Sequence, residues 1–384
     1  MDARPDTLLQ HLGEEERILG AVVPPIFQTS LFVFDDPHSM WDTMQHHPGG
    51  PPFHYSRLGN PTNHIAEQKI ASLEKAGACK LFASGMAAIS AAIVSVCRAG
   101  SHVVMVDTAY GPSRQVMENL LARFGVTHTL VDGRTVETVV DAIRPGTSLI
   151  YLESPSSLIF RLQDLAAIAA AAKERGIATA CDNTYCGALL QNPCELGVDM
   201  VVHSGTKYLN GHSDVVAGVL CTSTERMDAI VRNELALLGG ALPPFPAWLL
   251  MRGLGTLRLR LAQHAGTADT LAAWLSSHPK VRQVHHVSLP DYPQRDLYLR
   301  QMRGSGGLFS FEPTFATRDE VYRFCASLKW FRIGVSWGGH ESLAVPIEVH
   351  PLDWEAPRWM IRLYCGLEDP QDLIEDLERA MAQV

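Results

Sequence analysis

One lysine lies where a short apolar strand would end, beside residues that suit a phosphate group. Residues 198–204, VDMVVHS, form an apolar run too short for a helix, and the motif SGTKYLNGHSD, which begins with its last residue, carries Lys207. A lysine that snorkels to solvent is the first interpretation. However, Ser204 and Thr206 can donate hydrogen bonds to a phosphate, and a desolvated lysine can form a Schiff base with an aldehyde cofactor. The combination predicts a site for pyridoxal phosphate (PLP).

An aspartate at the end of a second strand fits the ring of that cofactor. Asp182 ends the apolar run GIATACD, residues 176–182, after a helix-like stretch in which Asp164 suits the N-cap and Gly176 the C-cap. The pyridine nitrogen needs an acid beside it, because a protonated ring accepts electrons from a substrate carbanion. Ligands of open α/β sheets bind at the carboxyl ends of strands. We therefore expect Asp182 and Lys207 to lie close together.

The phosphate needs hydrogen-bond donors, and two segments could supply them. After a short strand at residues 80–83, Gly85 and Met86 open an alanine-rich helix, whose N-terminal amides can bind an anion. A plain strand-to-helix turn is the alternative. In HYSRLGNPT, Tyr55 and Arg57 could also bind phosphate, because the guanidinium fork makes paired, charge-assisted hydrogen bonds.

A tyrosine after a third strand could pack on the cofactor. Tyr110 follows the run HVVMVDTA, and its ring could lie against the pyridine face. The alternative is a core tyrosine at the edge of a sheet. No GxGxxG follows a strand, so a nicotinamide-dependent dehydrogenase is disfavoured.

From about Gly20 to Val384 the chain resembles the Cys/Met-metabolism family of PLP enzymes. The motifs that carry the resemblance occur in the family's order: HYSRLGNPT, ASGMAA, ESPSS, CDNT, SGTKYLNGHSD, VSWGGHESL and IRLYCGLED. The family includes cystathionine β-lyases, γ-synthases and γ-lyases and methionine γ-lyases, and the motifs are most similar to those of bacterial cystathionine β-lyases. The resemblance implies an α/β fold of the aminotransferase-like type (fold type I). Its large domain would have a mostly parallel seven-stranded sheet, and its C-terminal domain would be a smaller α/β unit.

The resemblance also implies a role for each matching residue. The catalytic residues would be Lys207, as Schiff-base lysine and α-proton base, and Tyr110, which stacks on the ring held by Asp182. The groups that would hold the phosphate are Gly85, Met86, Ser204, Thr206, and Tyr55 and Arg57 from a neighbouring subunit. The substrate would be bound by Arg362, which grips the α-carboxylate, and by Ser157, Ser336 and Trp337. Tyr55 and Arg57 imply a homo-oligomer, and the resemblance favours a dimer of dimers, a homotetramer.

The implied activity is β-elimination of cystathionine to homocysteine, pyruvate and ammonia, a step of trans-sulfuration and methionine biosynthesis. GPSR after Tyr110, Ser157 and Trp337 are typical of β-lyases. Against this, YSRLGNPT is common among γ-acting members, and His340 replaces a tyrosine frequent in β-lyases. The stretch RNELALLGG, from Arg232, also lacks a tyrosine that β-lyases place near the distal end of cystathionine. A broader cysteine-S-conjugate β-lyase and a cystathionine γ-synthase or γ-lyase stay open. So does a catalytically silent α/β ligand-binding protein.

The composition agrees with a globular metabolic enzyme. The hydrophobic share of 46% is that of a globular protein. The net charge of −9 disfavours nucleic acid as a partner. There is no apolar run long enough for a membrane span, and the first residues are acidic where a secretion signal would be basic. We expect a cytoplasmic protein with a small-molecule amino-acid thioether as its substrate. The eight cysteines lack CxxC spacing, which predicts reduced thiols and no metal.

Three parts are predicted along the chain. Residues 1–58 contain two Pro-Pro pairs, at 24–25 and 51–52, and should form an irregular arm that contacts a neighbouring subunit. Residues 59–250 alternate strands with helices, as in a parallel sheet wrapped by helices, and form the PLP-binding large domain. Residues 251–384 form the C-terminal α/β domain. Its predicted strands are LFSFEP, the region around GVSWGG, and MIRLYCG, with helices at DEVYRFCASL and PQDLIEDLERAMAQ.

Overall fold

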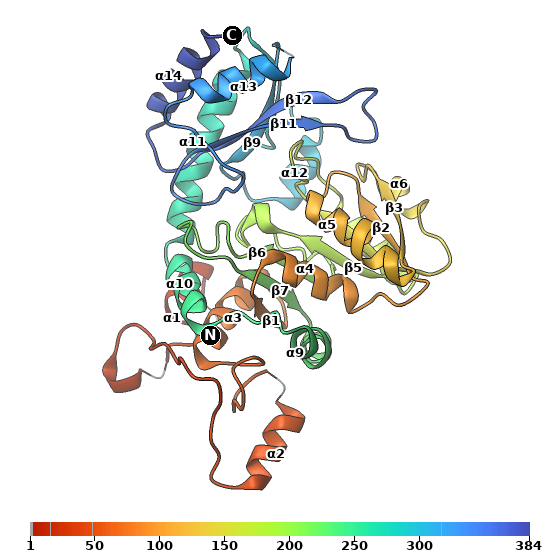
Figure 1. Ribbon diagram of the computed structural model, residues 1–384, viewed down its shortest axis with the longest axis vertical. Helices are drawn as coiled ribbons and strands as arrows, with labels where there is room; N and C mark the ends of the chain where they lie inside the picture. Colours follow the sequence, from red (N-terminus) through yellow and green to blue (C-terminus); the bar gives the residue numbers. More distant parts are fainter. Residues whose placement is uncertain (1–2, 16, 48, 316) are drawn as a thin grey trace.

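The computed structural model describes residues 3–15, 17–47, 49–315 and 317–384, and Figure 1 shows a large domain, a smaller domain above it and an arm below it. Within the described residues the large sheet has seven strands, in the order β1-β7-β6-β5-β4-β2-β3. Their bounds are β1 Ala78–Phe82, β2 His102–Val106, β3 Thr127–Val131, β4 Thr147–Glu153, β5 Ala178–Asp182, β6 Met200–Ser204 and β7 Gly218–Thr222. Only β7 runs antiparallel to its neighbours. The mostly parallel seven-stranded sheet is confirmed.

Helices cover this sheet because most crossovers between parallel strands, although not that from β5 to β6, return through an α-helix. They are α3 Pro61–Glu74, α4 Gly85–Val94, α5 Gly111–Gln115, α6 Val136–Val140, α7 Leu165–Glu174, α8 Thr224–Ile230, α9 Ala236–Leu238 and α10 Pro244–Leu254. The Asp164 side chain caps α7 by accepting from the Ala167 amide, and Gly176 follows the helix with a φ of +65°. The predicted N-cap is confirmed, and Gly176 lies one residue beyond the C-cap, Arg175. Helix α4 packs on β6 and β7, so its N-terminus lies near the end of β6.

The second domain begins with the long helix α11, Leu257–Ser276. Within the described residues its sheet has five strands, in the order β10-β11-β12-β9-β8. The bounds are β8 Val281–His285, β9 Leu308–Pro313, β10 Arg332–Ile333, β11 Leu343–Val349 and β12 Arg358–Tyr364, with helices α12 Arg295–Gln301, α13 Arg318–Ser327 and α14 Pro370–Met381. The smaller C-terminal α/β domain is confirmed. None of the described helices is long and apolar enough to cross a bilayer.

The predicted strand around GVSWGG is wrong. Residues 334–342 form an irregular loop, and the next strand begins only at Leu343. Gly338 has a φ of +93°, and a Cβ at this position would lie 2.7 Å from the carbonyl carbon of Lys207. The loop is therefore shaped by its close approach to the backbone at Lys207, which a regular strand would not permit.

The arm is more regular than predicted. It contains two helices, α1 Pro5–His11 and α2 Pro37–His46. The Asp36 side chain stabilises the start of α2 by accepting hydrogen bonds from the amides of His38 and Ser39. Figure 1 shows α2 projecting away from the two domains. Several large apolar side chains of the arm are exposed, among them Leu19, Val22, Val33 and Trp41. Exposed apolar side chains in such numbers mark an interaction surface.

Candidate active site

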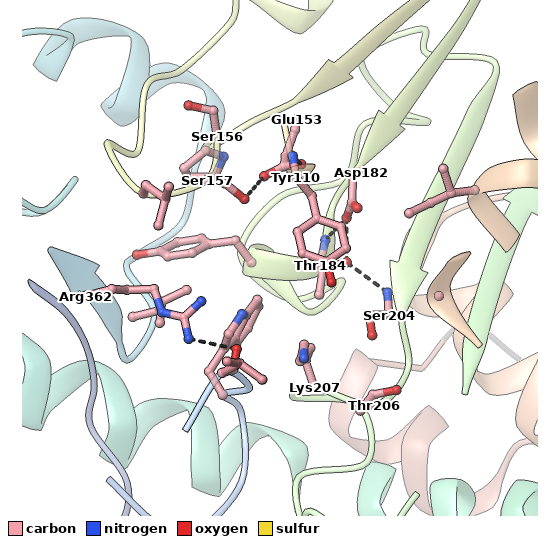
Figure 2. Close-up of a pocket in the computed structure, with 18 of the residues that line it drawn as sticks. Tyr110, Glu153, Ser156, Ser157, Asp182, Thr184, Ser204, Thr206, Lys207 and Arg362 are labelled. Atoms are coloured by element: carbon pink, nitrogen blue, oxygen red, sulfur yellow. Dashed lines mark hydrogen bonds between the residues drawn. The ribbon is translucent and has the colours of Figure 1, made fainter. Parts of the chain in front are cut away.

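A cavity of about 260 Å³ lies at the carboxyl ends of the central parallel strands (Figure 2). Its floor includes Glu153, Asp182 and Ser204, the last residues of β4, β5 and β6. The small domain contributes Trp337 and Arg362. Ten residues predicted for the site line the cavity: Gly85, Met86, Tyr110, Ser157, Asp182, Ser204, Thr206, Lys207, Trp337 and Arg362. The fold thus brings together side chains that are spread over nearly 280 positions of the sequence.

Lys207 follows β6 by three residues and points into the cavity (Figure 2). Its Nζ donates a hydrogen bond to Ser336 Oγ at 2.7 Å and lies 5.6 Å from the centre of the Trp337 ring. Burial and, to a smaller extent, the charge of Arg362 lower the pKa of Lys207 to about 8, although Asp182 opposes both effects. The amine is therefore close to losing its proton near neutral pH, as a nucleophile or base requires. Ser336 does not line the cavity, and its side chain contacts the site through this hydrogen bond to Lys207.

Asp182 is held by the turn that follows its strand. Its Oδ1 accepts hydrogen bonds from the Thr184 amide at 3.0 Å and from the Thr184 hydroxyl at 2.5 Å. The same hydroxyl accepts from the Ser204 amide at 2.8 Å, so one threonine connects the ends of β5 and β6. Burial raises the pKa of Asp182, whereas the bonds from Thr184 and the charges of His203 and Lys207 lower it. These contacts favour a carboxylate that is aimed into the cavity.

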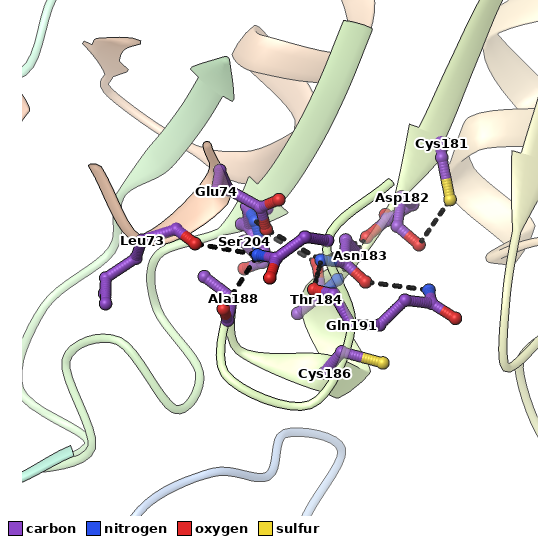
Figure 3. A network of polar contacts seen from close by, with 12 residues as sticks. Leu73, Glu74, Cys181, Asp182, Asn183, Thr184, Cys186, Ala188, Gln191 and Ser204 are labelled. Atoms are coloured by element: carbon purple, nitrogen blue, oxygen red, sulfur yellow. Dashed lines mark hydrogen bonds and ion pairs between the residues drawn. The ribbon is translucent and has the colours of Figure 1, made fainter. Parts of the chain in front are cut away.

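A buried polar network supports this turn from behind (Figure 3). Asn183 donates to Glu74 Oε1 at 2.7 Å and to the Gln191 carbonyl at 3.0 Å, and the Gln191 amide returns a bond of 3.0 Å to Asn183 Oδ1. His203 Nε2 lies 2.6 Å from the same Glu74 oxygen. Buried polar groups that satisfy one another fix a single geometry. The network therefore positions Asp182 through the residue that follows it.

The opposite end of the cavity has the donor set that a phosphate needs. Gly85 and Met86 begin α4, and the Ser84 side chain caps it. A Cβ at Gly85 would lie 3.0 Å from the Ser204 Cβ, so only glycine lets the helix start so close to β6. Within the described chain the Ser204 hydroxyl makes no hydrogen bond, whereas the Thr206 hydroxyl accepts from the Ala217 amide at 3.0 Å and donates a long bond, 3.3 Å, to the Ala217 carbonyl. A helix N-terminus beside the free Ser204 hydroxyl and the weakly donating Thr206 hydroxyl fits a phosphate group.

Arg362 lies on β12 and faces the cavity from the small domain (Figure 2). Its Nη2 donates to the carbonyls of Val335 at 2.9 Å and Ser336 at 3.1 Å, while its buried Nε has no partner. It forms no ion pair within the described residues, so a surface salt bridge does not account for it. Burial lowers the pKa of Arg362 to about 10. A half-buried guanidinium with an unused, buried Nε fits a substrate carboxylate.

Tyr55 and Arg57 do not reach the cavity of their own chain. The Tyr55 side chain is 41% exposed, and its ring lies 5.4 Å from the Arg57 guanidinium carbon. Arg57 donates to the Ala236 carbonyl. Their contribution from a neighbouring subunit stays a prediction.

Four polar residues of the cavity were missed by the sequence reasoning: Glu153, Ser156, Thr184 and Tyr185. Thr184 was hidden in CDNT, where only the aspartate drew attention, although a hydroxyl two residues after a strand-end carboxylate can bond to it. Glu153, the first residue of ESPSS, ends strand β4 as Asp182 ends β5, and that parallel was a usable signal. The apolar part of the wall includes Ile89, Leu158, Phe160, Val216, Leu308 and Val335.

Comparisons with known proteins agree with this site. The family model described as Cys/Met metabolism PLP-dependent enzyme matches residues 6–382. A cystathionine gamma-synthase from Mycobacterium tuberculosis is 38% identical over 98% of this chain and 96% of its own length, and an L-methionine gamma-lyase from Pseudomonas deceptionensis is 38% identical over 94% and 93%. The crystal structure of metB from Corynebacterium glutamicum aligns with a TM-score of 0.91 and 32% identity over 100% of this chain and 98% of that one. The chain belongs to the Cys/Met metabolism family of PLP-dependent enzymes.

Proposed function

We propose that the protein is a carbon–sulfur lyase that performs β-elimination on cystathionine, releasing homocysteine, pyruvate and ammonia. The observation that carries the proposal is the convergence of Lys207, Asp182 and Arg362 on one cavity. A base, an anion for the ring nitrogen and a carboxylate clamp are the groups that the chemistry of an amino-acid substrate requires. A catalytically silent binding protein would not need a lysine with a pKa as low as about 8.

Each of these residues has a defined task in the proposed reaction. Bound PLP supplies a protonated ring that accepts the electrons released at the substrate α-carbon. Asp182 holds the proton on the ring nitrogen, and its bonds from Thr184 keep the carboxylate ionised. Arg362 binds the α-carboxylate and so orients the Cα–H bond. Lys207, held by Ser336 at 2.7 Å, takes the α-proton from the substrate.

Two cavity residues support β-elimination over γ-elimination. Ser157 and Trp337 both line the cavity, and both are residues that are typical of β-lyases at these positions of the sequence. The Trp337 ring packs edge-on against Tyr208, 5.2 Å between ring centres, which fixes the indole beside Lys207. A broader cysteine-S-conjugate β-lyase would use the same groups.

Elimination or replacement at the γ-carbon is the second candidate. The relatives named cystathionine gamma-synthase and L-methionine gamma-lyase support it, since each is 38% identical to this chain over nearly its whole length. Lys207 could serve that reaction as well, because every such reaction begins with removal of the α-proton.

We further propose that the active enzyme is a homo-oligomer, a dimer of dimers, in which residues 1–58 contact a neighbouring subunit. The exposed apolar side chains of the arm and the distance of Tyr55 and Arg57 from their own cavity support this. The division of the rest of the chain near residue 250 is supported by the change from one sheet to the other between β7 and β8.

The products formed from cystathionine test the reaction. The PLP-loaded protein is incubated with cystathionine, and the keto acid and the thiol are identified, with Lys207→Ala as the control. Pyruvate with homocysteine is the expected result. Formation of 2-oxobutyrate with cysteine would replace the proposal with γ-elimination. No keto acid from cystathionine, S-methylcysteine or methionine would argue for γ-replacement if the protein forms cystathionine from an O-acylhomoserine and cysteine, and for a silent binding protein if it does not.

A further inference from the structure

A second carboxyl group, that of Glu153, lies in the cavity floor beside Asp182. Glu153 ends β4, is only 7% exposed and lines the cavity. Its Oε2 accepts from the Tyr110 amide at 2.7 Å, and its Oε1 lies 2.6 Å from the Ser157 hydroxyl (Figure 2). One buried carboxyl group therefore connects the start of α5, which carries Tyr110, to the loop that carries Ser157.

The two carboxyl groups are close because their strands are neighbours in register. Glu153 pairs with Asp182 at the carboxyl ends of the parallel strands β4 and β5, and such strands lie about 4.8 Å apart. Two buried carboxylates this close cannot both stay ionised without compensation. Their proximity therefore favours a proton on one of the pair.

The surroundings decide which of the two it is. Asp182 accepts two hydrogen bonds from Thr184 and lies near the positive charge of Lys207, and both stabilise its ionised form. Glu153 forms no ion pair within the described residues. Burial, followed by the charge of Asp182, raises the pKa of Glu153 to about 8.

The other titratable groups near Glu153 do not reverse this assignment. Tyr151, on the same strand, is fully buried, and burial keeps its pKa well above 10. Tyr110 faces Glu153 through its amide. Arg362 lines the same cavity, but its hydrogen bonds go to the Val335 and Ser336 carbonyls and it forms no ion pair with Glu153. The negative charge of Asp182 therefore remains the main charge that acts on Glu153.

We propose that Glu153 is a positioning residue that works as a neutral acid. Its carbonyl oxygen accepts from the Tyr110 amide and fixes the start of α5. Its hydroxyl donates to Ser157 Oγ, so the proton of the Ser157 hydroxyl is free to point into the cavity. When Glu153 ionises, the Ser157 hydroxyl donates its hydrogen bond to the Glu153 carboxylate. The cavity then loses a hydrogen-bond donor and gains a negative charge. The use of this donor by the substrate rests on the proposed function; the protonation of Glu153 does not.

The test compares two variants. In Glu153→Gln the amide reproduces the neutral acid, because its oxygen can accept from Tyr110 and its NH₂ group can donate to Ser157. In Glu153→Ala both bonds are lost. With S-methylcysteine as substrate at about pH 7, we expect kcat/KM of Glu153→Gln within about 3-fold of wild type and that of Glu153→Ala about 10- to 100-fold lower, the loss given by two hydrogen bonds. Glu137→Gln, an exposed acid on α6, is the matched control.

A measurement on the cofactor-free protein separates this role from the catalytic proposal. The folded pKa of Glu153 exceeds its unfolded value of 4.5, so its contribution to stability is complete below pH 4.5 and is lost as the pH rises through about 8. The melting temperature of Glu153→Gln minus that of wild type should therefore increase by about 3 °C or more between about pH 5 and pH 8. A difference that is independent of pH overturns the proposal, as does an equal loss of activity in Glu153→Gln and Glu153→Ala. Neither result would bear on which keto acid is formed.

Discussion

Replacing Lys207 with methionine should stabilise the cofactor-free protein at neutral pH. Burial lowers the pKa of Lys207 from 10.5 to about 8. Because each pKa unit corresponds to about 1.4 kcal/mol, the protonated amine costs the folded protein about 3 kcal/mol at pH 7. The hydrogen bond to Ser336 offsets about 1 kcal/mol of this. We therefore expect Lys207→Met to raise the free energy of unfolding by about 2 kcal/mol.

The pH dependence gives this prediction its sign. Between pH 8 and 10.5 the unfolded chain binds a proton at Lys207 that the folded protein does not, so wild-type stability rises with pH across this window. The advantage of Lys207→Met should shrink by about 2 kcal/mol between pH 7 and about pH 9.5. Urea unfolding of both proteins at the two pH values measures it, with Lys173→Met, an exposed lysine of α7, expected within about 0.5 kcal/mol of wild type. A Lys207→Met protein less stable than wild type at pH 7, or an advantage that does not change with pH, would refute the reasoning.

Three further substitutions test individual contacts. Thr184→Val removes the hydroxyl bond that favours ionised Asp182, so its pKa should rise and the acid limb of the pH–rate profile should move up by about half a unit to one unit; an unmoved limb would contradict this. Arg362→Lys cannot clamp a carboxylate with two nitrogens, and kcat/KM should fall about 10- to 100-fold while cofactor absorption persists. Asp376→Ala deprives three consecutive backbone amides of their acceptor and should lower the free energy of unfolding by about 3 kcal/mol, against almost no change for exposed Asp372→Ala. Equal effects of the two alanine variants would show that the buried acceptor does not matter.

The parts of the site that follow parallel strands could be predicted from the sequence. VDMVVHS and GIATACD are apolar runs that each end in a polar residue, and the strand-end rule places Asp182 and Lys207 at one edge. The structure puts both in one cavity. Arg362 lies 155 positions after Lys207, and no local pattern connects the two, so only the family resemblance could assign it to the site.

The errors arise where the conformation depends on distant contacts. The loop that carries Trp337 has its shape because Gly338 lies close to the Lys207 backbone. The apolar residues of the loop led to the wrong prediction of a strand. Strand β11 was missed because Pro346 interrupts an only partly buried run, and its pairing with β12 compensates for this. Glu153 was overlooked because its importance comes from Asp182, its neighbour across the sheet rather than along the chain.

The direct test of the account is where the cofactor is bound. The PLP-loaded protein is reduced with borohydride, which makes the bond between the cofactor aldehyde and a lysine amine permanent, and is then digested and mapped by mass spectrometry. The account predicts the added phosphopyridoxyl mass on the peptide that contains Lys207, and none on that peptide in Lys207→Met. The modification of a different lysine in the native protein, or of none, would contradict the assignment of this cavity as the active site.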